Sequence, residues 1–328
     1  MATARARWPA PSTRCVVPKG AAVFNEASIP DLSGRVAVIT GANSGLGLET
    51  ARMLSEHGAR VIMACRNTEK GDAARASLLA NNPTAELEVA RLDLADLSQI
   101  RAFADSLELD RLDLLINNAG VMALPRRETA DGFEMQIGTN HLGHFALTGL
   151  LLPKLLAAPA ARIVSVSSLM HRVGSIDLAD LHGASRYRKW PAYGQSKLAN
   201  LLFAFELDRR LRRAGASAIS VAAHPGYAAT NLQGVGPRME GARWFERATQ
   251  LANRLIAQDA AMGALPQVYA AVAPDVRGGD YYGPSGPMEM TGPPLKVSSS
   301  AKSRDEAMAR RLWEASEDAT GVSFDALG

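Results

Sequence analysis

A tyrosine and a lysine stand four positions apart in the stretch YGQSK, as Tyr193 and Lys197. The surrounding residues, 191–214, read as a helix, so the two side chains are expected on one face, one turn apart. A free phenol ionises near pH ~10, and a neighbouring ammonium favours its ionised form. Such a phenol can give or take a proton near working pH. The same pair also occurs on ordinary helix surfaces, so its meaning depends on the elements around it.

These residues lie in a chain whose apolar strands alternate with helical segments. Strands are predicted at 35–40, 60–65, 86–93, 112–118, 162–168 and 217–224. Helices are predicted at 47–58, 68–82, 97–108, 131–157 and 191–214, with an amphipathic helix at 309–321 that we expect to cover the sheet edge. Continuously apolar strands between helices indicate a parallel sheet covered on both faces. The prediction is an α/β fold, a doubly wound, mostly parallel Rossmann-type sheet of about seven strands.

Composition limits the classes of protein that fit. The chain has 328 residues, a net charge of +3 and only two cysteines, Cys15 and Cys65. This charge is too weak for a nucleic-acid surface, and no apolar run reaches the length of a membrane span. Residues 1–30 are rich in Ala, Pro and Arg and are expected to be a disordered extension, followed by one domain at 31–328. We expect a cytoplasmic protein without a metal site.

A glycine-rich stretch, TGANSGLG at 40–47, lies where the first strand meets the first helix. Gly41, Gly45 and Gly47 allow a tight turn and a close approach of the backbone. Free N–H groups at the start of a helix bind phosphate, and Asn43 and Ser44 can add neutral hydrogen bonds. The alternative interpretation is a glycine-rich turn without a ligand, but its position favours a dinucleotide.

The end of the second strand indicates which dinucleotide is bound. A carboxylate about 20 residues past the glycines would accept a ribose hydroxyl of NAD(H). This chain has Cys65 and Arg66 there instead. A guanidinium can bind the 2′-phosphate of NADP(H) through two charge-assisted hydrogen bonds. We therefore expect NADP(H) to be preferred, with NAD(H) possible if Arg66 points into solvent.

Six motifs in order resemble the short-chain dehydrogenase/reductase family over nearly the whole chain. They are TGxxxGxG at 40–47, NNAG at 117–120, TNHLGHF at 139–145, VSS at 166–168, YxxxK at 193–197 and HPGYAAT at 224–230. The phrases ACR and SKLAN, and the long connection before Tyr193, are similar to the retinol dehydrogenase and carbonyl reductase-like branch. The N-terminal membrane anchor of many members of that branch is not seen.

The resemblance implies roles for individual residues. Asn140, Ser168, Tyr193 and Lys197 match the catalytic positions, with Ser168 chosen over Ser167 by alignment. Pro225, Gly226 and Thr230 match the segment that seats the nicotinamide. The full set of expected cofactor-binding residues is Gly41, Asn43, Ser44, Gly45, Leu46, Gly47, Arg66, Asp93, Leu94, Asn117, Ala119, Gly120, Tyr193, Lys197, Pro225, Gly226 and Thr230.

These residues predict hydride transfer between nicotinamide and a carbonyl or alcohol, with Tyr193 as general acid and base. A catalytically silent cofactor-binding scaffold is the main alternative, and a C=C reductase is another, although no cysteine lies near the Tyr193 helix. The loops expected to set substrate specificity are 121–132, the long connection before Tyr193 and the stretch after Thr230. Their apolar and aromatic content suggests a bulky hydrophobic substrate: Met122, Leu169, Met170, Tyr187, Trp190, Tyr227 and Leu232. The surplus apolar content of 142–156 suggests a homodimer or tetramer.

Overall fold

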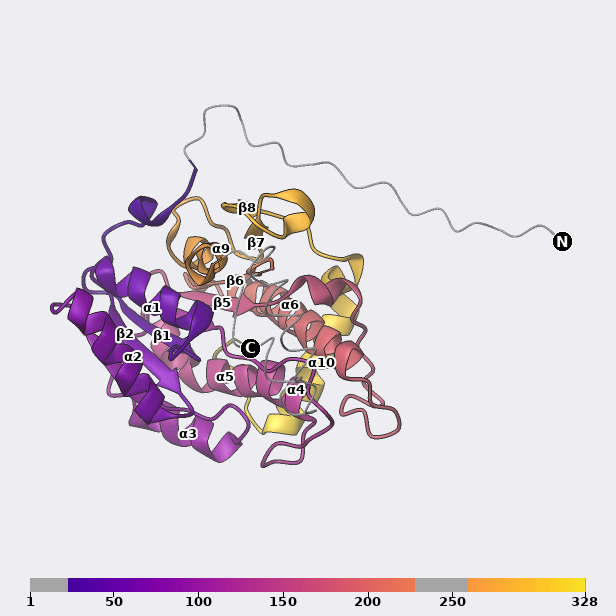
Figure 1. Ribbon diagram of the computed structural model, residues 1–328. Helices are drawn as coiled ribbons and strands as arrows, with labels where there is room; N and C mark the ends of the chain where they lie inside the picture. Colours follow the sequence, from indigo (N-terminus) through magenta and orange to yellow (C-terminus); the bar gives the residue numbers. More distant parts are fainter. Residues whose placement is uncertain (1–22, 228–258, 328) are drawn as a thin grey trace, which may run out of the picture.

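The computed structural model describes residues 23–227 and 259–327. Within these ranges the chain forms one twisted sheet with helices on both faces (Figure 1). The strand order is β3-β2-β1-β4-β5-β6-β7-β8, in which all neighbouring pairs are parallel except β7 and β8. The predicted doubly wound fold is confirmed. Within the described residues the sheet has eight strands, one more than expected, because the three-residue strand Pro294–Lys296 pairs antiparallel with β7 at the edge.

The elements follow the predicted order closely. The strands are β1 Val36–Thr40, β2 Arg60–Cys65, β3 Leu87–Arg91, β4 Leu114–Asn117, β5 Arg162–Val166, β6 Ile219–Ala223, β7 Tyr281–Pro284 and β8 Pro294–Lys296. The longer helices are α1 Gly45–Glu56, α2 Thr68–Asn81, α3 Leu97–Ser106, α5 Gly143–Leu156, α6 Lys189–Arg213, α9 Ala260–Val272 and α10 Glu306–Thr320.

Alternation along the strands divides the core into two layers. Val38, Ile62 and Leu115 face one layer, which contains α3, α5 and α6. The residues beside them, such as Ile39 and Met63, face the other layer, which contains α1, α2 and α9. Every strand end that carries a predicted site residue therefore lies between two packed layers, which hold it rigidly.

The predicted helix 131–157 differs from expectation in two ways. It begins at Met135 rather than 131, because the Glu134 carboxylate accepts the N–H groups of Gln136 and Ile137 and caps the start. It also contains a π-helical turn, Gly138–Leu142, labelled η2, between the short α4 (Met135–Ile137) and α5. Such wide turns occur often at functional sites, and this one contains the predicted catalytic Asn140.

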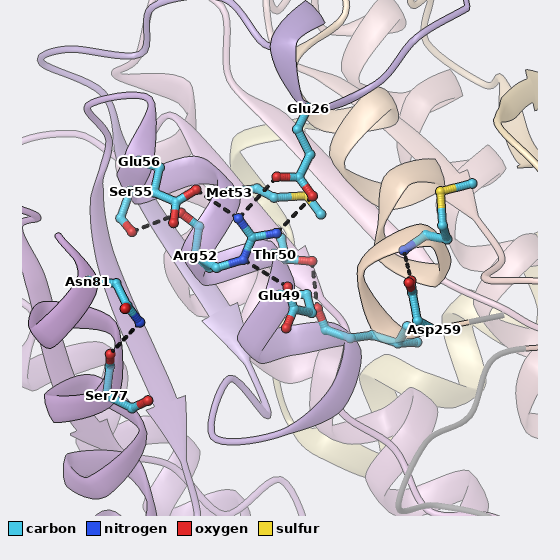
Figure 2. A network of polar contacts seen from close by, with 12 residues as sticks. Glu26, Glu49, Thr50, Arg52, Met53, Ser55, Glu56, Ser77, Asn81 and Asp259 are labelled. Carbon is cyan, nitrogen blue, oxygen red and sulfur yellow. Dashed lines mark hydrogen bonds and ion pairs between the residues drawn. The ribbon is translucent and has the colours of Figure 1, made fainter. Parts of the chain in front are cut away.

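The described part of the predicted extension, 23–30, is packed rather than disordered. Ile29 is buried, and Phe24 meets Tyr269 of α9 edge to face at 4.8 Å between ring centroids. Figure 2 shows the Arg52 guanidinium of α1 between three carboxylates, and two of its bonds, of 2.8 and 3.0 Å, go to Glu26. Apolar and ionic contacts therefore fix this segment on the domain, so the packed domain begins before residue 31.

Helix α10 packs on α5 and α6, not on the sheet edge as predicted. Trp313 and Phe324 close over Phe145 and Phe203, with ring centroids 4.5–6.3 Å apart. The reason is that α5 and α6 present aromatic side chains outward from the sheet, and α10 offers a matching apolar stripe. The surplus apolar content that suggested a dimer is thus covered within the chain. Among the helices that the structure describes, none is long and apolar enough to cross a membrane.

Candidate active site

Tyr193 and Lys197 lie on one face of α6, as their spacing predicts. The Lys197 Nζ is 5.8 Å from the centroid of the Tyr193 ring. Both side chains are buried, with exposed fractions of 8% and 4%. Lys197 also donates to the carbonyl of Val166 at the end of β5, over 3.1 Å, which fixes the ammonium beneath the ring. The ammonium therefore lies against the face of the phenol ring.

Burial shifts the pKa values of both groups. Loss of solvent raises the pKa of Tyr193 to about 12, against a lowering effect of its hydrogen bond with Ser168. Loss of solvent also lowers the pKa of Lys197 to about 8. The expected lowering of the Tyr193 pKa by Lys197 is therefore not found for the polypeptide alone, because desolvation is the larger effect. Positive charge from an oxidised nicotinamide would act in the lowering direction.

The two candidate serines make different contacts. The Ser168 hydroxyl lies near the Tyr193 hydroxyl and acts to lower its pKa, and the Ser168 oxygen accepts the Met170 N–H over 3.2 Å. Ser167 is buried and donates to the Lys197 carbonyl over 2.8 Å. Period-two alternation at the end of β5 explains the difference. Ser168 is thus the serine with a hydroxyl beside the tyrosine.

Asn140 lies on the π-helical turn and is fully buried. Its amide accepts the Val121 N–H over 2.7 Å and donates to the Val121 carbonyl over 2.9 Å. It also donates to Ser196 over 2.9 Å, on the helix that carries Tyr193. A Cβ at Gly120 would lie 3.1 Å from the Asn140 Oδ1 and 3.5 Å from the Lys197 Nζ. Glycine at this position therefore keeps the space beside Asn140 and Lys197 open.

His144 connects Asn140 to the first strand. Its Nδ1 lies 3.0 Å from the Asn140 carbonyl, and its Nε2 lies 2.9 Å from the Thr40 hydroxyl. The Thr40 oxygen also accepts the N–H groups of Asn118 and Ala119, each over 2.9 Å. A carbonyl only accepts, so Nδ1 carries the proton and Nε2 accepts from Thr40. Burial lowers the pKa of His144 to about 4, which keeps it neutral.

The glycine loop has the features of a phosphate site. Gly41 and Gly45 have φ values of 68° and 55°, where other residues are strained. A Cβ at Gly47 would lie 2.4 Å from the Gly41 carbonyl. Ser44 precedes α1 without a side-chain cap, so the first N–H groups of the helix remain for a ligand. These residues fit the pyrophosphate of a nicotinamide dinucleotide.

A cleft joins the glycine loop to the tyrosine. It is lined by Gly41, Asn43, Ser44, Gly45, Leu46, Gly47, Asn118, Ala119, Gly120, Val121, Val166, Ser167, Tyr193, Lys197 and Pro225. Most of the predicted cofactor residues of strands β1, β4 and β6 therefore meet in one place. Asn118, Val121, Val166 and Ser167 were not predicted, although the NNAG motif contained the signal for the first. Ser168, which was preferred to Ser167, is not among these lining residues.

Asn117 does not line this cleft, contrary to prediction. Its side chain points to α5 and donates to Thr148 over 3.0 Å. Asn118, the next residue, is the one that faces the cleft, and its amide donates to the Thr40 carbonyl over 2.8 Å. The physical reason is again alternation at a strand end. Any contribution of Asn117 to the cofactor has to come from its backbone.

The remaining predicted cofactor residues lie at the margin or outside the described residues. Arg66 is exposed at the end of β2 and has no hydrogen bond or ion pair within residues 23–227 and 259–327, so its guanidinium is available. Asp93 accepts the Ala95 N–H over 3.0 Å. Leu94 is buried against Gly143, where a Cβ would lie 2.4 Å from the Leu94 carbonyl.

The turn after β6 is described only in part. Gly226 has a φ of 66° and packs against the Met290 carbonyl, 2.3 Å from where a Cβ would lie. The predicted Thr230 and the specificity residue Leu232 lie outside the described residues. Within the described ranges, no group of three or more His, Cys, Asp or Glu side chains is placed to hold a metal ion.

Comparisons with known proteins agree with this geometry. The family model for short chain dehydrogenases matches residues 35–240. Human retinol dehydrogenase 11 is 40% identical over 302 residues, which are 91% of this chain and 89% of that protein.

Two solved structures extend the comparison. The crystal structure of an uncharacterized protein from Mycobacterium Paratuberculosis superposes with a TM-score of 0.77 at 46% identity, covering 92% of this chain and 99% of that one. A protein from Escherichia coli CFT073, described as a short chain dehydrogenase complexed with NADPH, has a TM-score of 0.50 at 25% identity over 61% of this chain and 80% of its own.

Proposed function

The chain belongs to the short-chain dehydrogenase family, in its retinol dehydrogenase branch, and from this premise we propose an NADP(H)-dependent exchange of hydride with a bulky hydrophobic substrate. The reacting group is a carbonyl in one direction and a primary or secondary alcohol in the other. One observation carries the proposal: the Tyr193 hydroxyl lies beside Ser168, the Tyr193 ring lies over the Lys197 ammonium, and Tyr193 and Lys197 line the same cleft as the glycine loop.

The proposed chemistry assigns one task to each residue. When bound, NADPH supplies the hydride that adds to the carbonyl carbon. The carbonyl oxygen, held by the Ser168 hydroxyl, takes the phenolic proton of Tyr193 and becomes the alcohol oxygen. Lys197 stabilises the phenolate that remains until a proton from solvent replaces the lost one. Asn140 holds the Val121 backbone and the Tyr193 helix in place around this reaction.

Two observations support NADP(H) over NAD(H). Arg66 stands exposed at the end of β2, and Cys65 occupies the position where a carboxylate would accept the ribose hydroxyls. The related protein from Escherichia coli that carries NADPH is consistent with this preference. A cytoplasmic location and a dimer or tetramer stay predictions from the sequence.

A catalytically silent scaffold is the main competing proposal. Such a protein would retain the glycine loop and have no need for a buried lysine under a buried tyrosine. Burying an ammonium costs free energy unless its charge is used or paired, so the Lys197 position favours turnover.

A panel of carbonyl compounds of increasing size tests the proposal directly. Each compound is incubated with the full chain and NADPH or NADH, and nicotinamide absorbance is followed. We expect faster turnover with NADPH and a preference for larger apolar carbonyls. NADPH binding without turnover of any carbonyl or alcohol in the panel would support the scaffold instead.

A further inference from the structure

Four buried polar side chains follow one another at intervals of four along the helix that starts at Met135. They are Gln136, Asn140, His144 and Thr148, each with an exposed fraction of 2% or less. Three of them bind strand ends or the backbone beside Tyr193 and belong to the site described above. Gln136 is the fourth, and nothing in the proposed chemistry uses it.

Every hydrogen-bonding atom of the Gln136 amide has a partner. Its oxygen accepts the Ala123 N–H over 2.7 Å. Its nitrogen donates to the Tyr187 hydroxyl over 2.8 Å and to the Lys189 carbonyl over 2.9 Å. An amide has two N–H donors, so both are used. One buried side chain thus joins two segments that lie far apart in the sequence.

Tyr187 closes the connection into a ring. Its hydroxyl donates to the Leu124 carbonyl over 2.7 Å, next in the chain to Ala123. Burial raises the pKa of Tyr187, so the phenol stays a neutral donor. The ring therefore runs from Gln136 to Ala123, along the backbone to Leu124, across to Tyr187 and back.

The segment held by this ring has an unfavourable backbone conformation. Ala123 has a φ of 51°, in the left-handed region that non-glycine residues rarely adopt. Its N–H is buried, so without the Gln136 oxygen it would be left unpaired. Strained residues of this kind persist only where their surroundings determine them, and they concentrate at functional sites.

One of the joined segments lines the cleft, and the other lines a second hollow, through Tyr187, and leads into the helix that carries Tyr193. Val121, two residues before Ala123, lines the cleft directly and is itself held by Asn140. On the other side, the Lys189 carbonyl precedes Trp190, which is 47% exposed and stands one turn before Tyr193 on α6. In Figure 1 the start of α6 and the short α4 lie on the same side of the molecule.

We propose that Gln136 is a positioning residue that fixes the 121–124 and 187–190 segments as one wall of the substrate cleft, and so sets the preference for bulky hydrophobic carbonyls. The proposal deepens the function proposed above and rests on it. A compact carbonyl needs only Ser168 and Tyr193, which other contacts hold. A bulky one also has to lie against the wall.

The test compares the bulkiest and the most compact carbonyl compounds that the wild-type chain reduces. Gln136→Leu keeps the size of the side chain and removes all three bonds. We expect the KM for the bulky compound to rise about tenfold, while kcat for the compact one changes less than about twofold. The KM for NADPH should stay constant. The matched control is Gln99→Leu on α3, a glutamine also held by side-chain bonds but distant from the cleft.

Tyr187→Phe is the second variant and covers the case in which Gln136→Leu fails to fold. It removes one hydroxyl, so the same selectivity ratio should fall about threefold. An equal loss for both compounds, or an unchanged ratio in a folded variant, overturns the proposal. Absence of turnover in the wild-type chain overturns the proposed function instead, so the two failures are distinguishable.

Discussion

The cofactor half and the substrate half of the cleft are built in different ways. At the cofactor end the ligand-facing groups are backbone, exposed by Gly41, Gly45 and Gly47 at the start of α1. At the substrate end they are held by buried side-chain amides, Gln136 and Asn140. A backbone site depends on local conformation, which glycine allows. An amide site depends on contacts between segments far apart in the chain, so it can change with sequence while the fold persists.

The largest effect is expected where the two halves meet. Tyr193→Phe removes the proton donor and leaves the ring in place. Turnover should fall by ~10² to ~10⁴, while the melting temperature and the NADPH dissociation constant change little. Steady-state kinetics and a thermal melt measure both. Near-normal turnover would mean that another group supplies the proton.

Adding one carbon atom at Gly47 should disrupt the glycine loop and weaken cofactor binding. A Cβ at position 47 would lie 2.4 Å from the Gly41 carbonyl and 2.6 Å from the Asn118 amide nitrogen. Overpacking of this kind costs ~1 to ~3 kcal/mol, so Gly47→Ala should weaken NADPH binding about tenfold to hundredfold. Gly215→Ala, with open space around it, is the control and should leave binding unchanged. Unchanged binding in both variants would contradict a backbone-built site.

Acid should destabilise the fold through the helix at the substrate end. Burial lowers the pKa of His141 to about 3 and that of His144 to about 4, from an ordinary value of 6.5. Below pH 6.5 the two histidines bind protons in the unfolded chain but stay neutral in the folded chain. Stability is therefore full above 6.5 and is lost as pH falls toward 4, at about 1.4 kcal/mol per pH unit for each histidine.

Urea unfolding at pH 7 and pH 5 measures this loss. His141→Gln keeps a polar group near Ser316, which lies 3.0 Å from the imidazole, and removes one titration. The difference between the two pH values should shrink in that variant. An unchanged difference would show that other groups, such as carboxylates, dominate the acid response.

The preference for NADPH over NADH should depend on the exposed Arg66, and its loss should change that preference modestly. Arg66→Ala should raise the KM for NADPH about tenfold, because one charge-assisted contact is lost, and leave the KM for NADH almost unchanged. Cys65→Asp combined with Arg66→Ala should invert the preference. Specificity constants for both cofactors provide the measurement, and equal losses for both in the single variant would show that Arg66 does not meet the 2′-phosphate.

The smallest effect is expected at the N-terminal segment. Glu26→Gln weakens its paired bonds to Arg52, whose side chain is 24% exposed and keeps Glu49 and Glu56 as partners. A partly exposed pair contributes at most about 1 kcal/mol. Chemical unfolding should show a loss within that range, with no change in cofactor binding. A larger loss would mean that the segment supports α1 itself.

Motifs and periodicity predicted the sheet, its order of elements and the cofactor end, because these follow from local rules. Which of Asn117 and Asn118 faces the cleft could not be predicted, since alternation at a strand end cannot be assigned without the register. Gln136 could not be found from sequence, because its partners lie 13, 51 and 53 residues away. The sign of the Tyr193 pKa shift required the burial of the ring, which only tertiary packing determines.

The π-helical turn at Gly138–Leu142 makes the length of this helix a constraint on the site. A wide turn of this kind is equivalent to one additional residue in an α-helix. Deleting one residue there would restore regular α-helical geometry, so Gln136, His144 and Thr148 would keep their mutual orientation, while Asn140 would leave its place in the wide turn. The residues on either side would still reach the 121–124 loop, β1 and β4, but the Val121 backbone would lose its two bonds to Asn140. A single-codon deletion in this turn would therefore separate a folded helix from an intact catalytic corner.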